Sequence, residues 1–382
     1  MKNLECKYNK KCGGCRYQRF TYEEQLQIKQ NWVNELLNKF GKVDDIVGAE
    51  NPYFYRNKIH STFANLPKGE VTSGTYEEHS HRVVPIDKCL IQDEKADEII
   101  LTIRKLAKSF KMRAYDVDKG QGLLRHVLIR TGKKSGEILL VLVLSSHIFP
   151  GKKNFVKAIR KEHPEITSIV VNVNDKKTSM ILGDREFTIY GKGFIVDELC
   201  GKNFKISPKS FYQINHDQTE KLYSKALEVA AFEGHETILD AYSGTGTIGI
   251  IAADRVKDVI SVELNKDAHK DAVMNAKKNE VGNVRFFNAD AGQFCIELAD
   301  NKEKIDAVIM DPPRSGSDEN FINSVLKLSP AKVIYISCNP ETLARDLNMF
   351  TGKYEVKSIT PFDLFPWTGH VETVVLMSRR EK

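Results

Sequence analysis

The feature that most constrains the fold is a regular alternation of short apolar runs with helical stretches after residue 206. The runs read TILDAY, VISVEL, VRFFNA, DAVIMD, KVIYIS and TVVLM. This alternation is typical of a mostly parallel sheet with helices on both faces. Ligands of such sheets bind beyond the carboxyl ends of the strands. We therefore expect residues 206–382 to form a doubly wound α/β domain with its site at that edge of the sheet.

Residues 1–205 follow a different pattern. The β-like runs VLIRTG, ILLVLVLS, TSIVVNVN and FTIYG are separated by turn residues, with one helical stretch, FVKAIRKEH. They predict a β-rich (α+β) domain. Near its start, residues 21–41 place apolar side chains near helical spacing and end on Gly41, a helix stop signal. We expect this helix to pack on the second domain.

The charge is divided unevenly between the two parts. Residues 1–205 contain 36 Lys and Arg against 25 Asp and Glu, whereas residues 206–382 contain 21 against 26. A basic domain suits a polyanionic partner. Ordinary solvated charge remains the simpler interpretation of each single basic run, namely RNKIH, RKLAKSFKMR and GKKNFVKAIRK. The longest apolar run, ILLVLVL, is far too short to cross a bilayer, so we expect a cytoplasmic monomer without membrane contact.

A glycine-rich turn predicts the cofactor crevice. In TILDAYSGTGTIGI, Gly244, Gly246 and Gly249 satisfy the pattern G-x-G-x-x-G, and Glu263 ends the next strand, where a carboxylate can bind a ribose diol. Nicotinamide enzymes and S-adenosylmethionine enzymes share such crevices. The run DAVIMDPPRSG favours the second group, because Asp311 before two prolines suits recognition of a planar amide or a base edge.

Cys338 directly follows the strand-like run KVIYIS. Asn339 is a good N-cap and Pro340 suits the first helical position, so the cysteine lies beside a helix N-terminus. The partial positive charge there favours a thiolate. A small buried core residue is the alternative. We favour a nucleophile, because Asp311 and the glycine turn are expected at the same edge.

A thiolate has a chemical use in a methyltransferase that acts on uracil. Carbon 5 of uracil is a poor nucleophile, and addition of a thiolate to carbon 6 gives an enolate whose carbon 5 can take a methyl group. A base must then remove the carbon 5 proton. Glu372, which follows Trp367 and His370, is our candidate for that base.

The N-terminal cysteines indicate a metal site. Cys6, Cys12 and Cys15 form C-x5-C-x2-C, and Cys89 follows in PIDKCLIQD. Four thiolates suit zinc or an iron–sulfur cluster. Zinc fingers usually pair two close couples, so the three-plus-one spacing favours the cluster over zinc. Cys200 and Cys295 belong to no motif and are interpreted as structural.

The chain resembles the RNA uridine-5-methyltransferases, which make 5-methyluridine in ribosomal and transfer RNA. The resemblance covers nearly all of residues 206–382 and lies in SPKSFYQINHDQTEKLY, LDAYSGTGTIG, VISVELN, MDPPRSG, SCNPETLARDL and DLFPWTGHVETVVLM. It implies a Rossmann-like S-adenosylmethionine (SAM) methyltransferase domain. Residue by residue it implies Cys338 as nucleophile, Glu372 as proton acceptor, and Gln213, Tyr242, Glu263 and Asp311 as SAM and crevice contacts. Thr247 stands where some relatives have an asparagine that touches the cofactor.

The resemblance also bears on the cluster and the substrate. Family members with a 4Fe-4S cluster in this arrangement mainly modify 23S ribosomal RNA, although archaeal tRNA-modifying relatives keep it. We therefore expect 23S rRNA as the substrate, with a tRNA uridine as the alternative. Many relatives begin with an oligonucleotide-binding (OB-like) β-barrel, and none is expected here because the chain opens on the cysteine loop. Two other classes stay open: an exocyclic-amino nucleobase methyltransferase, and a non-catalytic iron–sulfur RNA-binding protein or redox sensor.

Overall fold

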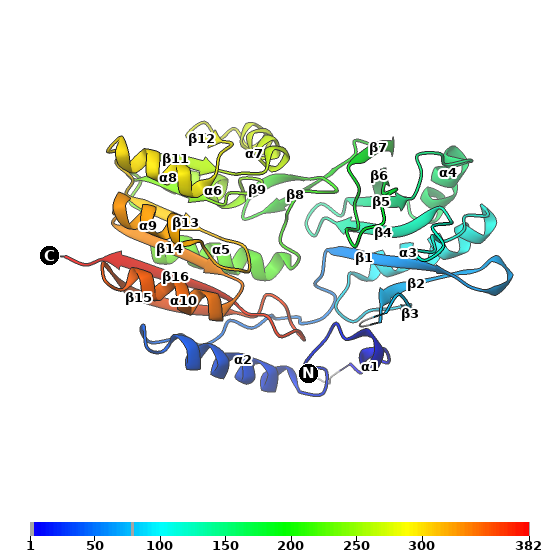
Figure 1. The fold of residues 1–382 in the computed structure, drawn as a ribbon, viewed down its shortest axis with the longest axis horizontal. Helices are drawn as coiled ribbons and strands as arrows, with labels where there is room; N and C mark the ends of the chain where they lie inside the picture. Colours follow the sequence, from blue (N-terminus) through cyan, green and yellow to red (C-terminus); the bar gives the residue numbers. More distant parts are fainter. Residues whose placement is uncertain (1–3, 78–79, 382) are drawn as a thin grey trace.

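The computed structural model describes residues 4–77 and 80–381. It contains two seven-stranded sheets, with a two-stranded hairpin between them (Figure 1). The hairpin strands are β8 (Ile195–Leu199) and β9 (Lys202–Ile206). Across the described ranges, no helix has the length and apolarity that a membrane span requires.

The C-terminal sheet has the strand order β12-β11-β10-β13-β14-β16-β15. Strands β10 to β14 pair in parallel, whereas β16 is antiparallel to both β14 and β15. The direction of strand order reverses between β10 and β13, which is where sheets of this kind bind ligands. The doubly wound α/β fold predicted for this part is confirmed. The bounds are β10 Thr237–Ala241, β11 Asp258–Val262, β12 Val284–Phe287, β13 Ala307–Met310, β14 Lys332–Ser337, β15 Tyr354–Phe362 and β16 Glu372–Arg379.

Helices cover both faces of this sheet, and alternate residues of its strands belong to two different cores. Ile238 and Ile309 pack on one side with α5, α6 and α7, while Leu239 and Val308 pack on the other with α8, α9 and α10. This period of two is the geometry of a strand buried on both faces. The helices are α5 His216–Ala230, α6 Thr247–Ala252, α7 Lys266–Lys278, α8 Ala291–Asp300, α9 Glu319–Leu328 and α10 Pro340–Phe350, with a 3-10 turn, η2, at Ala253–Arg255.

The N-terminal sheet has the order β3-β2-β1-β4-β5-β6-β7. Two helices cover one face of this sheet, whereas the sequence predicted a single helix, at α4 (Lys152–Glu162). The additional helix is α3 (Glu94–Ser109), which is capped by Asp93 and packs beside α4. The opposite face joins the core of the hairpin and of α5. The strands are β1 Lys58–Asn65, β2 Val71–Tyr76, β3 Val83–Pro85, β4 Leu124–Thr131, β5 Ile138–Leu144, β6 Ile166–Val173 and β7 Arg185–Tyr190, with a 3-10 turn, η1, at Pro67–Gly69.

The N-terminal segment packs on the C-terminal sheet. After a short helix, α1 (Asn9–Cys12), helix α2 (Tyr22–Leu37) starts with a capping box at Thr21 and lies against α10 and β15 (Figure 1). It ends before the expected stop at Gly41. Residues 43–47 then run parallel to β15 and bridge to its edge. Lys29 of α2 and Asp363, just past β15, form a fully buried ion pair with a distance of 2.6 Å between Nζ and Oδ1.

Candidate active site

One pocket collects all the predicted catalytic and cofactor residues. It lies beyond the carboxyl ends of β10, β11, β13 and β14 and has a volume of about 490 Å³. That volume falls in the usual range for small-molecule sites. Its lining includes Gln213, Tyr242, Glu263, Asp311, Cys338 and Glu372. Glu372 belongs there because it is the first residue of antiparallel β16, which starts where the parallel strands end.

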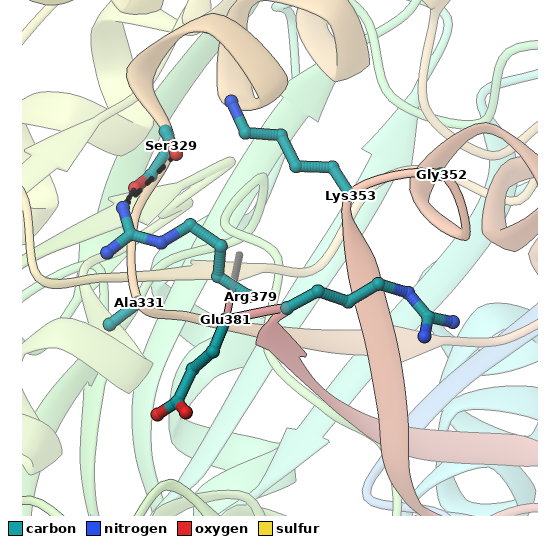
Figure 2. Close-up of a pocket in the computed structure, with 7 residues that line it drawn as sticks. Ser329, Ala331, Gly352, Lys353, Arg379 and Glu381 are labelled. Atoms are coloured by element: carbon teal, nitrogen blue, oxygen red, sulfur yellow. Dashed lines mark hydrogen bonds between the residues drawn. The ribbon is translucent and has the colours of Figure 1, made fainter.

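A second pocket, of about 730 Å³, lies at the opposite edge of the same sheet (Figure 2). The cationic side chains of this pocket donate hydrogen bonds to backbone carbonyls at helix ends and turns. Arg379 donates to the carbonyl of Ser329, and Lys353 donates to the carbonyl of Leu326. Cations commonly stabilise the free carbonyls at a helix C-terminus. We therefore place the active site in the first pocket.

The glycine turn is shaped for close approach. Gly246 caps α6 with φ of 78°, a conformation that favours glycine. A Cβ on Gly249 would lie 2.6 Å from Oδ2 of Asp240, so this glycine lets the helix start pack directly on the strand. The fingerprint predicted from the sequence thus has a structural reason at each of these two positions.

The carboxylate of Glu263 is held by the backbone of the pocket. Its Oε2 accepts from the amide of Gly244 at 2.8 Å, and its Oε1 accepts from the amide of Asn265 at 2.6 Å. Near it, the hydroxyl of Ser243 is buried and has no hydrogen-bond partner among the described residues. A fixed acceptor and a free hydroxyl at a glycine turn fit the ribose and polar groups of SAM.

Tyr242 is fixed at the same edge. Its hydroxyl lies 3.0 Å from Oγ of Ser317, and its ring packs on Phe321 with centroids 5.1 Å apart. Its φ of 62° places it in the left-handed region, directly after β10. The residue is therefore held in an unusual conformation at the pocket wall, a common property of ligand sites.

Three acids share the floor of the pocket. Burial raises the pKa of Asp311 to about 7. Burial, and then the neighbouring Asp311, raise the pKa of Glu372 well above its usual value. Burial, Glu372 and Asp311 together raise the pKa of Cys338 to about 12.

Burial and the two carboxyls therefore oppose the thiolate predicted at Cys338. Its own backbone amide at the start of α10 does lower the pKa, as does Arg314, but burial and the two carboxyls outweigh both. The sequence thus predicted correctly that the backbone at the start of α10 lowers the pKa of Cys338. The sequence reasoning expected Asp311 and Glu372 in the same crevice but did not consider that their charges raise the pKa of the thiol.

The sequence reasoning missed several lining residues. Tyr223 comes from α5, and its hydroxyl lies near Gln213 and Asp311. Phe211 is 64% exposed at the pocket mouth, and Phe365 lies in the loop before Glu372. The motifs SPKSFYQINHDQTEKLY and DLFPWTGHVETVVLM contain all three of these aromatic residues, so their position in the motifs was an available signal.

The four N-terminal cysteines also come together. Cys6, Cys12, Cys15 and Cys89 line one small pocket with Tyr8, Ile86 and Leu90. Burial, with contributions from the neighbouring thiols, raises the pKa of Cys15 to about 12. In residues 4–77 and 80–381, however, no group of three or more His, Cys, Asp or Glu side chains is arranged so that it could hold a metal ion. The predicted cluster therefore stays a prediction.

The two remaining cysteines lie away from both sites. Cys200 occupies the β8–β9 turn with φ of 50°, and Cys295 is buried in the core under α8 and α9.

The fold and this pocket define a class of protein. A seven-stranded doubly wound sheet, a glycine turn beside a ribose-binding carboxylate, and an Asp-Pro-Pro loop form the domain of a Rossmann-like SAM-dependent methyltransferase.

The particular family follows from comparison with known proteins. Residues 21–380 match the tRNA (uracil-5-)-methyltransferase family, so the chain belongs to it. It is 42% identical to an uncharacterized RNA methyltransferase of Clostridium acetobutylicum over 385 residues, covering 99% of this chain and 84% of the relative. It is 40% identical to an uncharacterized RNA methyltransferase of Halalkalibacterium halodurans over 382 residues, covering 97% and 82%.

A solved structure agrees with this assignment. The tRNA (uracil-54, C5)-methyltransferase of Pyrococcus abyssi, in complex with S-adenosyl-L-homocysteine, matches with a TM-score of 0.81 and 29% identity, covering 95% of this chain and 85% of that one. The predicted activity of an RNA (uracil-5-)-methyltransferase that uses SAM is confirmed. Family membership also argues against the exocyclic-amino and non-catalytic alternatives.

Proposed function

We propose that this protein methylates carbon 5 of a specific uridine in 23S rRNA through a covalent cysteine–uracil intermediate. The observation that supports the chemistry is the convergence of Cys338, Asp311 and Glu372 in the pocket that also holds the cofactor residues. The four gathered cysteines support the ribosomal substrate, because the 23S-modifying branch is the one they resemble. A tRNA uridine is the second candidate, supported by the Pyrococcus abyssi tRNA enzyme of similar fold.

In this mechanism the thiol of Cys338 loses its proton to solvent and Sγ bonds to carbon 6 of the uracil. The electron pair of the ring double bond moves to the carbonyl as an enolate, and carbon 5 then takes the methyl group. Glu372 accepts the carbon 5 proton, the double bond re-forms and Sγ leaves as a thiolate. When bound, SAM supplies a methyl group on a positively charged sulfur, whose charge favours the ionised forms of both side chains.

The other site residues have positioning roles in this proposal. Glu263 binds the ribose diol, while Gln213 and Tyr242 contact the cofactor. Asp311 lies next to Cys338 in the pocket. In this proposal it contacts both SAM and the edge of the uracil ring. The raised pKa of Glu372 suits it to accept a proton from carbon, since a stronger base transfers protons more readily.

The two parts of the chain divide the work in this proposal. Residues 1–205 dock folded RNA, and residues 206–382 carry the chemistry, because every predicted catalytic and cofactor residue comes from the second part. The target uridine leaves its stack to reach the pocket. The protein acts as a monomer in the cytoplasm.

We further propose that Cys6, Cys12, Cys15 and Cys89 hold a 4Fe-4S cluster with a structural role, zinc being the alternative. The support for this proposal is that four thiols line one small pocket. No electron is needed by the methyl transfer, which favours a structural role.

The test of the covalent step uses RNA that contains 5-fluorouridine, which blocks loss of the group at carbon 5. The wild type is expected to form an SDS-resistant RNA adduct, and Cys338→Ala none, with SAM binding preserved. Glu372→Gln is expected to accumulate the methylated adduct on ordinary RNA. Glu341→Gln, an exposed position on α10, is the matched control. An adduct in Cys338→Ala would refute the assignment.

The substrate is decided separately by mass spectrometry of 5-methyluridine in 23S rRNA and in bulk tRNA from a strain that lacks the gene. We expect the loss of one 5-methyluridine from 23S rRNA. Loss from tRNA alone would support the second candidate.

A further inference from the structure

One face of the N-terminal sheet carries a row of basic groups beside the catalytic pocket. On β1, Lys58, His60 and Thr62 alternate with buried Ile59 and Phe63. Their partners across the antiparallel pair are Arg130, Leu128 and His126 on β4. Residues opposite each other in such a pair share one face of the sheet. This is the face that turns toward the hairpin and α5 rather than toward α3 and α4.

The start of β1 is attached to the wall of the pocket. The amide of Asn57 donates to the carbonyl of Ile214 at 2.9 Å, and its Nδ2 donates to the carbonyl of Gln213 at 3.0 Å. The backbone of Arg56 forms an isolated antiparallel β-bridge with that of Asn215. Because Gln213 and Ile214 line the pocket, Arg56 and Lys58 lie at its border.

The charges of Arg56 and Lys58 are not neutralised by the protein. Neither side chain forms an ion pair within residues 4–77 and 80–381, and the Lys58 ammonium makes no hydrogen bond there. Burial, and then the neighbouring Arg130 and Arg56, lower the pKa of Lys58 to about 8. Arg130 is different, because its guanidinium donates to the carbonyls of Pro208 and Ser210 and so holds the linker to the second part of the chain.

The other two basic runs lie elsewhere. They belong to α3, α4 and the segments next to them, on the far face of the sheet. Part of their charge is already used: Lys108 pairs with Glu70 and Arg104 pairs with Asp87, each at 2.7 Å. The basic surface is therefore not uniform, and Arg56 and Lys58 carry unneutralised charge on the part of it that is attached to the pocket wall.

We propose that Arg56 and Lys58 bind backbone phosphates of the nucleotides that flank the target uridine. Partly buried cations create a local positive potential that attracts a polyanion such as RNA. Phosphate contacts fix the register of a nucleic acid and carry no sequence information. The inference rests on RNA as the substrate but not on the covalent step or on the choice of 23S rRNA.

The experiment measures binding of a 12-nucleotide oligouridylate as a function of salt concentration, with Lys58→Gln compared to the wild type. We expect roughly fivefold to tenfold weaker binding at moderate salt and a salt slope smaller by about 0.7, the value for one lost phosphate contact on a single strand. An oligouridylate with a neutral methylphosphonate backbone should bind the two proteins equally. Lys58→Arg should keep the wild-type slope.

Lys105→Gln is the matched control, because Lys105 is exposed on α3 at the far face and forms no ion pair among the described residues. SAM affinity by calorimetry checks that each variant is folded. An unchanged slope in Lys58→Gln, an equal loss in Lys105→Gln or in Lys58→Arg, or weakened SAM binding in Lys58→Gln would overturn the proposal. Failure of the 5-fluorouridine adduct would leave these binding results intact, so the two proposals fail independently.

Discussion

At the scale of single residues, the proposed chemistry depends on Asp311, Cys338 and Glu372, which come together in one pocket from distant parts of the chain. Burial raises the pKa of both Cys338 and Glu372, Asp311 raises both further, and Glu372 also raises the pKa of Cys338, so the neutral forms of these two side chains are favoured. A thiol that is unreactive before the substrates bind is protected from oxidation and alkylation. Ligand binding can then set when the nucleophile becomes active.

Asp311→Asn tests this coupling in the protein without ligands. A carboxylate beside a thiol raises the thiol pKa, so removing its charge lowers the pKa and increases the thiolate fraction at pH 8. Alkylation of Cys338 by iodoacetamide, followed by peptide mass spectrometry, should become faster by a few-fold and at most about tenfold, since one pKa unit corresponds to tenfold. Cys200 in the same sample is the internal reference. Slower alkylation of Cys338 would contradict the coupling.

At the scale of elements, the loop between β15 and β16 links the cysteine pocket to the active site. Trp367 in this loop is buried, stacks on Tyr53 with centroids 5.1 Å apart, and donates from Nε1 to the carbonyl of Pro52 at 2.9 Å. Cys15 and Cys89 pack on the same aromatic cluster. Phe365, two residues before Trp367, and Glu372, at the end of the loop, both line the catalytic pocket, so order in the cysteine segment supports the proposed base.

Cys89→Ser should loosen this loop. We expect the anaerobically purified wild type to contain about four irons, and the variant to have lost them, by metal and sulfide analysis. Hydrogen exchange across residues 363–371 should be faster in the variant, whereas Cys200→Ser should leave both measurements unchanged. One zinc in place of iron would support the alternative metal, and unchanged exchange would refute the link to the loop.

At the scale of the whole molecule, the N-terminal segment completes the C-terminal domain. Helix α2 covers β15 and α10, and residues 43–47 extend the sheet edge. Lys29 and Asp363 are both 0% exposed and form an ion pair across this junction. Lys29 also donates to the carbonyl of Phe365 at 3.2 Å. A fragment of residues 206–382 alone would therefore expose an apolar face and a buried carboxylate.

Lys29→Met should test this junction. Removing one partner of a buried pair leaves the other charge without compensation, so the free energy of unfolding should fall by about 3–5 kcal/mol. Urea denaturation followed by tryptophan fluorescence measures the change, since Trp367 lies beside the junction. Lys29→Met with Asp363→Asn should recover part of the loss, because no charge then remains buried. A cost below about 1 kcal/mol for the single variant would contradict a stabilising pair.

The strand and helix periods, the caps and the glycine turn were readable from the sequence because they depend on residues close together in the chain. They were enough to place Glu263, Asp311 and Cys338 at one edge, since parallel strands share their carboxyl ends. Strand β15 was missed because it is a charged edge strand with a proline, and its pattern resembles a loop. The hairpin β8–β9 was missed because polar and charged residues interrupt the apolar residues of both strands, IVDEL and KNFKI.

Tertiary structure alone decided the rest. The antiparallel direction of β16 brings Glu372 to the active edge, and pairing of β1 with β4 gathers the basic row beside the pocket. Both depend on contacts between segments far apart in sequence. The same holds for the ionisation of Cys338, because burial and neighbouring charge are set by the packed molecule and not by the residues next to it in the chain.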